Sequence, residues 1–258
     1  MKIMGILNVT PDSFSDGGKY VDIEKAVAHA KQMVADGADV IDIGGKSTRP
    51  GAESVSIEEE LARVIPVIKR LKEEIGTPIS IDTYKAEVAR QAVVAGAEII
   101  NDVGGAKFDP NMPHVMAETG VQVILMHNRL SSDFGAYENL ILDVKREVKA
   151  SIDLVVRAGV RDEKIILDPG IGFAKTIDQN IELMKNLSEL QTLGYPLILG
   201  VSKKGTLREL MEDEDKSLLG IGTIATTCYA YTQGIDYIRV HDVKENKRAI
   251  QVMKNLSV

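Results

Sequence analysis

The stretch IMGILNVTPDSFSDGGKYVDIEKAVAHAKQMVADGADVIDIGG, residues 3–45, contains the unit that decides the fold. It opens with the apolar run Ile3–Leu7, continues through the polar stretch Asn8–Val21 and closes with a second apolar run, Asp39–Ile43. Gly37 precedes the second run, and glycine readily adopts the left-handed backbone that ends a helix. Between the runs, apolar residues recur with the i, i+3, i+4, i+7 spacing of one helix face: Ile23, Ala26, Val27, Ala30, Met33 and Val34. The stretch therefore predicts a strand, a helix and a second strand.

The same unit recurs along the whole chain. Eight short runs rich in Ile, Val or Leu alternate with longer amphipathic segments: Ile3–Leu7, Asp39–Ile43, Pro78–Ile81, Glu98–Ile100, Val121–Met126, Lys164–Leu167, Leu197–Val201 and Asp236–Val240. A glycine is expected to end the helix before each later run: Gly37, Gly76, Gly96, Gly120, Gly159, Gly194 and Gly234. Apolar runs without strict alternation are typical of parallel strands buried on both faces. The pattern predicts an α/β fold, a single (β/α)8 TIM barrel that spans residues 1–258 as one domain.

Composition restricts the class of protein. The chain is 44% hydrophobic and 27% charged, the balance of an ordinary globular protein. Its formal net charge of −7 argues against a nucleic-acid partner, since such binding depends on clustered Lys and Arg. The first residues lack a signal-peptide layout, and no apolar run reaches the roughly 18 residues of a membrane span. One cysteine, Cys228, allows no internal disulfide, and its apolar neighbours predict a buried structural thiol. We expect a cytoplasmic protein without membrane contact.

Polar residues follow the predicted strands at their carboxyl ends, where active sites of this barrel form. Each of the eight runs has such residues: Asn8, Asp42, Asp82-Thr83, Asn101-Asp102, His127-Asn128, Asp168, Ser202-Lys203-Lys204, and Arg239 with His241. A single polar residue there is often a helix cap or a turn former, and Thr83 and Asp102 remain open to that interpretation. Eight polar strand ends together indicate a binding site.

The residue types at this rim indicate a ligand. Asp82, Asn101 and Asp168 offer hydrogen-bond acceptors, and Asn101 also offers donors, for the edge of a flat nitrogen heterocycle. A second group offers cationic donors for a phosphate or pyrophosphate: Lys204, Arg239, His241 and Arg49. A solvated surface charge remains the alternative for Arg49 and for Lys203.

Oxygen ligands for Mg²⁺ are available from Asn8 and Asp16. The sequence contains none of the motifs G-x-x-x-x-G-K-S/T, G-x-G-x-x-G after the first strand, G-x-S-x-G and H-E-x-x-H. Cys228 falls in a predicted helix. Covalent catalysis by Ser or Cys and a structural zinc site therefore lack support.

Two long motifs resemble the signatures of the dihydropteroate synthases. Residues 5–18 read GILNVTPDSFSDGG, and residues 37–51 read GADVIDIGGKSTRPG. Shorter matches follow in order: Ile81–Thr83, Asn101–Asp102, Leu125–His127, Leu167–Phe173, Ser202–Lys204 and Arg239–His241. The resemblance spans essentially the whole chain. It implies a transferase of folate biosynthesis that joins 6-hydroxymethyl-7,8-dihydropterin pyrophosphate to p-aminobenzoate and releases pyrophosphate.

The resemblance also implies how the pterin is held. Four residues would bind its ring deep in the barrel, and three would line the pocket: Asp82, Asn101, Asp168 and Lys204, then Val103, Met126 and Gly200. Electrons of the ring nitrogens can expel the pyrophosphate and leave a cationic methylene. Asp82 would stabilise that cation electrostatically.

The other groups of the substrates are assigned in the same way. Pyrophosphate would be held by Asn8, Arg49, Arg239 and His241, with Asn8 as the ligand of Mg²⁺. The p-aminobenzoate site would be framed by Ser47, Thr48, Arg49, Pro50, Phe173 and Lys204. Asp16, with Phe14 and Ser15, belongs to a first loop expected to close over the leaving pyrophosphate and exclude water. Catalytic roles are thus implied for Asp82, Lys204, Arg239, His241, Asp16 and Arg49. The resemblance further implies a homodimer and sensitivity to sulfonamides, which mimic p-aminobenzoate.

Three positions depart from the family pattern. Lys46 stands where Glu or an apolar residue is frequent, Lys203 where Arg is usual, and Gly205 where Ser is common. Lys cannot reproduce the fork of Arg, and Gly removes a hydroxyl. We hypothesise that the p-aminobenzoate site is altered while the pterin site is intact.

Two rival functions remain open. A methyltransferase domain that presents methyltetrahydrofolate to a corrinoid protein would share the barrel and the Asp/Asn pocket. It would not need the Asn-Val-Thr-Pro-Asp run, Arg239 or His241, because its substrate has no pyrophosphate. A pterin-binding protein without turnover is the other, and Lys46 and Gly205 support it. Release of pyrophosphate on mixing both substrates with Mg²⁺ separates a working synthase from this protein without turnover.

Overall fold

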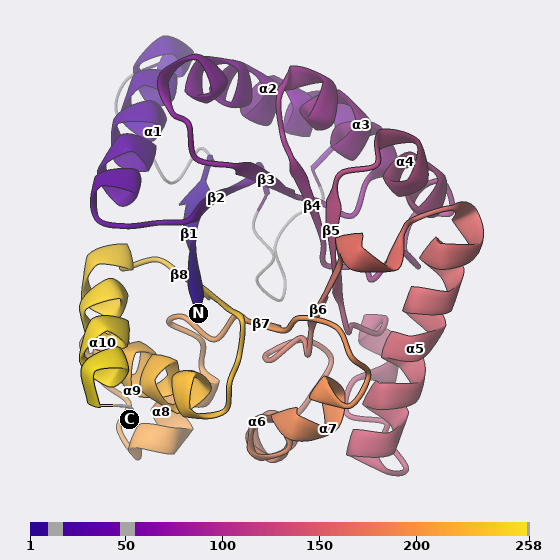
Figure 1. The fold of residues 1–258 in the computed structure, drawn as a ribbon, viewed down its shortest axis with the longest axis vertical. Helices are drawn as coiled ribbons and strands as arrows, with labels where there is room; N and C mark the ends of the chain where they lie inside the picture. The colour runs from indigo at the N-terminus through magenta and orange to yellow at the C-terminus, as the bar shows by residue number, and fades with distance from the viewer. Residues whose placement is uncertain (10–17, 47–54, 257–258) are drawn as a thin grey trace.

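The computed structural model describes residues 1–9, 18–46 and 55–256. In this part of the chain, strands form a central barrel and helices surround it (Figure 1). The strands are β1 Lys2–Asn8, β2 Val40–Gly44, β3 Ile79–Asp82, β4 Ile99–Asp102, β5 Gln122–Met126, β6 Ile165–Asp168, β7 Ile198–Leu199 and β8 Tyr237–Val240. The α-helices are α1 Gly18–Ala35, α2 Ile57–Glu74, α3 Ala86–Ala95, α4 Met112–Thr119, α5 Leu140–Ala158, α6 Ile177–Lys185, α7 Leu187–Gln191, α8 Thr206–Met211, α9 Leu219–Thr232 and α10 Val243–Leu256.

The sheet is parallel throughout and closes on itself. Its strand order is β6-β5-β4-β3-β2-β1-β8-β7. The two ends meet through a parallel bridge between Leu167 and Leu197, next to a hydrogen bond of 2.9 Å from Leu167 N to Pro196 O. The predicted (β/α)8 barrel is thereby confirmed, with a short seam where β7 has only two residues.

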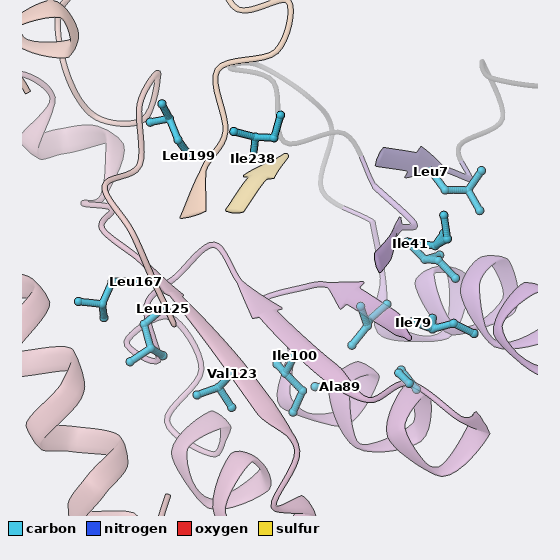
Figure 2. Packing of buried hydrophobic residues seen from close by; sticks show 14 of the residues in the cluster. Leu7, Ile41, Ile79, Ala89, Ile100, Val123, Leu125, Leu167, Leu199 and Ile238 are labelled. Carbon is cyan, nitrogen blue, oxygen red and sulfur yellow. The ribbon is translucent and has the colours of Figure 1, made fainter. Parts of the chain in front are cut away.

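Side chains of the strands alternate between the barrel interior and the layer of helices. One cluster of buried residues fills the interior: Met4, Val40, Ile99, Ile124, Ile166, Ile198 and Tyr237. Outward residues of the same strands, such as Leu7, Ile100 and Leu167, join the larger core that includes the helices (Figure 2). The strands are therefore buried on both faces, as the unbroken apolar runs predict.

The glycines after the helices behave as predicted, with one exception. Six of them have positive φ: Gly37, Gly96, Gly120, Gly159, Gly194 and Gly234. The exception is Gly76, since α2 already ends at Glu74 and Ile75 is extended with φ −126°. An extended Ile75 turns the chain toward β3, so the left-handed residue is not needed there.

Two other expectations need correction. The crossovers that follow β6 and β7 each contain two helices, α6 with α7 and α8 with α9, rather than one. Cys228 lies in α9, as predicted, but it is half-buried rather than buried. Successive residues of a helix point about 100° apart, so Cys228 sits at the flank of the face that buries Thr223, Thr227 and Ala230.

In the described part of the chain, no helix is long and apolar enough to cross a membrane.

Candidate active site

A layer of polar side chains lies above the apolar layer inside the barrel. Each of these positions comes two residues after an inward-facing residue, so it faces inward as well. Asp42 follows Val40, Asn101 follows Ile99, and Asp168 follows Ile166. Arg239 stands in the same relation to Tyr237 on β8. We call Asp42, Asp82, Asn101, Asp168 and Arg239 the polar floor.

Arg239 connects the acidic residues of this floor. Its Nε donates to Asp42 Oδ2 at 2.6 Å, and its Nη2 donates to Asp82 Oδ2 at 2.7 Å. Asn101 Nδ2 donates to the same Asp42 oxygen at 3.1 Å. Burial lowers the pKa of Arg239, but the charges of Asp42 and Asp82 outweigh this effect and raise that pKa above its ordinary value. The guanidinium therefore stays charged, and two of its five N–H donors are directed at carboxylates.

Two carboxylate oxygens of the polar floor are left for a ligand. Asp42 Oδ1 and Asp82 Oδ1 are buried and have no hydrogen-bond partner among the described residues. An unpaired buried acceptor costs about 1–3 kcal/mol, which a ligand with N–H donors would offset. Burial also raises the pKa of Asp82 to about 6, although the charge of Arg239 acts in the opposite direction. These oxygens fit a heterocycle that presents donors along one edge.

Asp168 and Lys204 form the other side of the site. A Cβ at Gly200 would lie 3.7 Å from Asp168 Oδ2 and 3.8 Å from Arg239 Cβ, so Gly200 keeps the space between them open. Lys204 Nζ donates to Ile171 O and lies 4.5 Å from the centre of the Phe173 ring. Burial lowers the pKa of Lys204 to about 8, against the opposing charge of Asp168. Phe173 thus presents an aromatic ring beside a lysine next to the polar floor.

The rim above the polar floor carries Asn8 and His241. Asn8 is exposed. A Cβ placed at Gly44 would lie 3.7 Å from Asn8 Oδ1 and 3.8 Å from Asp82 Oδ2, so Gly44 lies between these two side chains. His241 Nδ1 is 2.9 Å from Ser202 Oγ, which also accepts from His241 N at 3.2 Å. Ser202 thus fixes the orientation of the His241 ring at the end of β8.

The donor set at this rim suits Mg²⁺ only in part. In residues 1–9, 18–46 and 55–256, no group of three or more His, Cys, Asp or Glu side chains is placed to hold a metal ion. Asn8 offers one oxygen in an exposed position. Mg²⁺ usually keeps several waters and binds through one or two protein oxygens together with substrate phosphates. The site therefore fits a magnesium ion that arrives with a pyrophosphate.

Other predicted site residues are placed as follows. Val103 and Met126 are buried beside the carboxyl ends of β4 and β5. Asp102 faces away from the interior and accepts from Gly104 N and Ala106 N, both at 2.7 Å. Asp102 is thus a turn former, one of the two interpretations that the sequence left open. Seven predicted residues lie outside the described residues: Phe14, Ser15, Asp16, Ser47, Thr48, Arg49 and Pro50.

The three departures from the family pattern have different surroundings. Lys46 Nζ lies 3.2 Å from the centre of the Tyr84 ring, and burial lowers the pKa of Lys46. Lys203 is an exposed residue that pairs with Asp242 at 2.7 Å, in line with a surface charge. Gly205 is exposed, and the nearest heavy atom to its Cβ position is Arg208 Nη2 at 3.6 Å. A serine therefore fits at Gly205 without a clash.

Asp42 is the member of the polar floor to which the sequence assigned no role. It is fully buried and accepts hydrogen bonds from both Asn101 and Arg239. The position of Asp42 in the sequence could have indicated a role in the site, because Asp42 lies two residues before Gly44, where β2 ends. The partners of Asp42 depend on the register of β2 against its neighbours, which the spacing alone does not give.

Comparison with known proteins adds a family to this geometry. The chain matches the family described as pterin binding enzyme over residues 4–241. The dihydropteroate synthase of Bacillus subtilis (strain 168) is 52% identical over 97% of this chain and 87% of that protein. The dihydropteroate synthase of Clostridium beijerinckii is 51% identical over 97% of this chain and 92% of its own length.

Solved structures agree with this assignment. The dihydropteroate synthase of Clostridium difficile, determined with pteroic acid, has a TM-score of 0.94 at 48% identity and covers 99% of this chain and 96% of its own. That of Xanthomonas albilineans, determined with 4-aminobenzoic acid, has a TM-score of 0.93 at 42% identity and covers 99% and 92%. The same enzyme in complex with 7,8-dihydropteroate has a TM-score of 0.90 at 39% identity and covers 99% and 93%.

Proposed function

The chain belongs to the pterin binding enzyme family, in which its relatives are dihydropteroate synthases, and we propose the following chemistry from that premise. The enzyme condenses 6-hydroxymethyl-7,8-dihydropterin pyrophosphate with p-aminobenzoate to 7,8-dihydropteroate and releases pyrophosphate. The observation that carries the proposal is the polar floor, with two buried carboxylate oxygens that have no partner among the described residues. The names of solved relatives include pteroic acid, 4-aminobenzoic acid and 7,8-dihydropteroate as bound molecules, which supports these substrates.

The polar floor suits the hydrogen-bonding edge of a pterin. The amino and amide groups of the ring present N–H donors in one plane, and carboxylates accept from two such donors at once. We assign Asp168, Asn101 and Asp82 to this edge, with Val103 and Met126 against the ring faces and Lys204 as a further donor. Gly200 has no side chain, so the space between Asp168 and Arg239 leaves room for a flat ring.

Bond breaking is proposed to precede bond making. Electrons of the ring nitrogens form a double bond to the methylene as its C–O bond breaks, and that bond pair leaves with the pyrophosphate. The amine of p-aminobenzoate then attacks the cationic methylene through its lone pair and loses one proton. Asp82 stabilises the cation, since an ionised carboxylate in a site of low dielectric acts strongly on a developing charge.

The leaving pyrophosphate is assigned to the rim. Arg239 and His241 would bind its oxygens by charge-assisted hydrogen bonds, and Asn8 would hold Mg²⁺. When bound, Mg²⁺ neutralises charge on the departing oxygens. Asp16 and Arg49 keep the catalytic roles that the resemblance implies, and both lie outside the described residues.

The second substrate is assigned to the space beside Phe173. The ring of Phe173 would stack against the arene of p-aminobenzoate. Lys204 Nζ lies 4.5 Å from the centre of the Phe173 ring. Ser47, Thr48 and Pro50 complete the assigned site, together with Arg49. Sulfonamides are proposed to compete here, because they present a similar arylamine.

The experiment is an assay of pyrophosphate release with both substrates and Mg²⁺. We expect sustained release when p-aminobenzoate is present, with dihydropteroate formed in equal amount. Asp82→Ala, Asp168→Ala and Arg239→Ala should each fold, judged by circular dichroism, and lose activity. Binding of the pterin without turnover would favour the non-catalytic alternative, and methyl transfer from methyltetrahydrofolate would favour the methyltransferase.

We further propose that the protein works as a homodimer in the cytoplasm. Two neighbouring helices expose apolar side chains, with Ile221 on α9 exposed by 64% and Leu210 on α8 by 45%. Apolar residues of this size on adjacent helices are suited to contact with a second copy of the chain. The single cysteine, which forms no internal disulfide, is consistent with a reducing compartment.

A further inference from the structure

The turn that follows β6 carries residues of both proposed substrate pockets. Asp168 ends the strand, and Phe173 follows five positions later. Gly170 N donates to Asp168 Oδ1 at 2.7 Å, and Phe173 N donates to Gly170 O at 3.1 Å. Three residues of the turn have left-handed backbones: Gly170 (φ 70°), Gly172 (φ 82°) and Ala174 (φ 48°). Such a turn needs support from outside its own backbone.

That support comes from Lys175, to which neither the sequence nor the proposed mechanism gives a role. Lys175 is only 3% exposed. Its Nζ donates to Gly170 O at 3.0 Å and to Phe173 O at 3.1 Å. Burial lowers the pKa of Lys175 to about 7, although the charge of Asp168 raises it. A lysine buried at such a cost is expected to make contacts that water cannot replace.

Other side chains hold the turn at other points, and Asn180 Nδ2 also donates to Lys175 O and Thr176 O. Asn180 Oδ1 accepts from Gly172 N at 2.6 Å, and Lys204 Nζ donates to Ile171 O. Among the described residues, Lys175 has hydrogen bonds both to the residue that anchors Asp168 and to Phe173 itself. Its ammonium thus connects the carboxylate of one pocket to the aromatic wall of the other.

We propose that Lys175 is a positioning residue, whose ammonium holds Asp168 and Phe173 as one unit and so aligns the pterin with p-aminobenzoate. The proposal rests on the proposed function in one respect, since that function assigns the two pockets to these substrates. Removing the ammonium takes the side-chain donor from Phe173 O and leaves Gly170 O with Phe173 N as its donor. The turn would then relax toward water or other donors, and both Asp168 and Phe173 would move from their places.

The test compares variants that differ in the donors they offer. Lys175→Met keeps an unbranched side chain one atom shorter than lysine and removes all N–H donors. We expect about a tenfold rise in the KM for p-aminobenzoate and in the Kd for 6-hydroxymethylpterin measured by calorimetry. Lys175→Gln has the same length as the Met variant but retains an amide donor that reaches one carbonyl at most, so both constants should rise by about threefold.

Lys107→Met is the control, at a lysine that is exposed but has the same type of contact. Lys107 is also a lysine whose pKa is lowered by partial burial, and its Nζ donates to a single backbone carbonyl, Asn128 O, at 3.2 Å. Among the described residues, no hydrogen bond or ion pair joins Lys107 to the turn after β6. Lys107→Met should leave both constants within twofold of the unchanged protein, and a rise equal to that of Lys175→Met would overturn the proposal.

Single-pocket variants separate this proposal from the proposed function. Phe173→Ala should raise only the KM for p-aminobenzoate, and Asp168→Asn only the Kd for the pterin. If these two variants fail to do so, the pocket assignment is wrong. If they succeed and Lys175→Met leaves either constant unchanged, the positioning role is wrong. Should Lys175→Met not fold, Lys175→Gln decides, and unchanged constants in that variant reject the role.

Discussion

At the scale of single residues, the charge of Asp82 is expected to control the rate. Burial raises the pKa of Asp82 to about 6, against the opposing effect of Arg239. The proposed mechanism requires the ionised form, because only a carboxylate stabilises the cationic methylene. The rate at saturating substrates should therefore fall about tenfold per pH unit below about pH 6 and stay level above it. A pH–rate profile over this range measures the effect.

Asp102 provides the control for that profile. Burial raises its pKa to about 6 as well, but its oxygens accept from Gly104 N and Ala106 N and face away from the site. Asp102→Asn should keep the acidic limb of the profile, whereas Asp82→Asn should be inactive at every pH. If the acidic limb of the pH–rate profile disappears in Asp102→Asn, the ionisation that controls the rate belongs to Asp102 and not to Asp82.

The same two carboxyls affect stability with the opposite sign. Each has a higher pKa in the folded chain than the ordinary value of 3.8, so the folded state binds protons more tightly. Their contribution to stability is fully present below about pH 4 and is lost as the pH rises through about 6. Asp102→Asn should therefore weaken the pH dependence of the urea midpoint in this window.

Gly205 tests whether the second-substrate site is altered. Its backbone, with φ −58° and ψ −30°, accepts any residue, and it precedes α8 without a side-chain cap. Gly205→Ser adds a hydroxyl beside Lys204, so we expect a lower KM for p-aminobenzoate with an unchanged pterin Kd. The helix should gain only a few tenths of a kcal/mol from the serine cap. Steady-state kinetics decide the matter, and an unchanged KM would refute the idea.

Residue types at strand ends were predictable, whereas their partners were not. The sequence indicates Asp82, Asn101 and Asp168, because polar residues that end apolar runs must lie at one rim of a parallel barrel. Asp42 and Lys175 received no role. Their contacts depend on the register of neighbouring strands and on the path of one turn, and neither is encoded in local spacing.

At the scale of elements, the turn after β6 depends on glycine at position 170. Its φ is 70°, and a Cβ there would lie 1.9 Å from His127 O, a backbone atom that cannot move aside. Gly170→Ala should lower the free energy of unfolding by at least about 3 kcal/mol, because strain and overlap add. Urea denaturation followed by circular dichroism gives this value.

Gly120 is the matched control for the backbone term. It ends α4 with φ 62°, and nothing lies within 4 Å of its Cβ position. Gly120→Ala should therefore lower the free energy of unfolding by only about 1 kcal/mol, the cost of a left-handed alanine. Equal losses in the two variants would mean that the contact with His127 O is unimportant.

Element types were easier to predict than element ends. The spacing of apolar residues predicted the strands and the first helices, since the buried face of an element determines where apolar residues recur. The short additional helices α7 and α8 were missed, because they have only five and six residues. The strand predicted at Leu197–Val201 is shorter in the structure, Ile198–Leu199, because few ladder hydrogen bonds form at the seam.

At the scale of the whole molecule, the barrel closes at its weakest pairing. β7 pairs with β8 through two residues, and the seam between β6 and β7 is an isolated bridge. Eight units predicted closure, but nothing in the sequence indicated where the two ends of the sheet would meet. The helices after these strands, α6 to α9, lie together at this side of the barrel (Figure 1).

The outer surface of this side is where a second copy is proposed to dock. Ile221 on α9 is 64% exposed, and α8 and α9 lie beside each other. Light scattering should give twice the chain mass of 28.1 kDa for the unchanged protein. Ile221→Glu should shift the mass toward one chain, because it places a charge in a contact that must lose water.

Val94→Glu is the control, since Val94 is 85% exposed on α3, which lies across the barrel from α9 (Figure 1). A mass of one chain for the unchanged protein would reject the dimer, and a dimer that persists in Ile221→Glu would place the docking surface elsewhere.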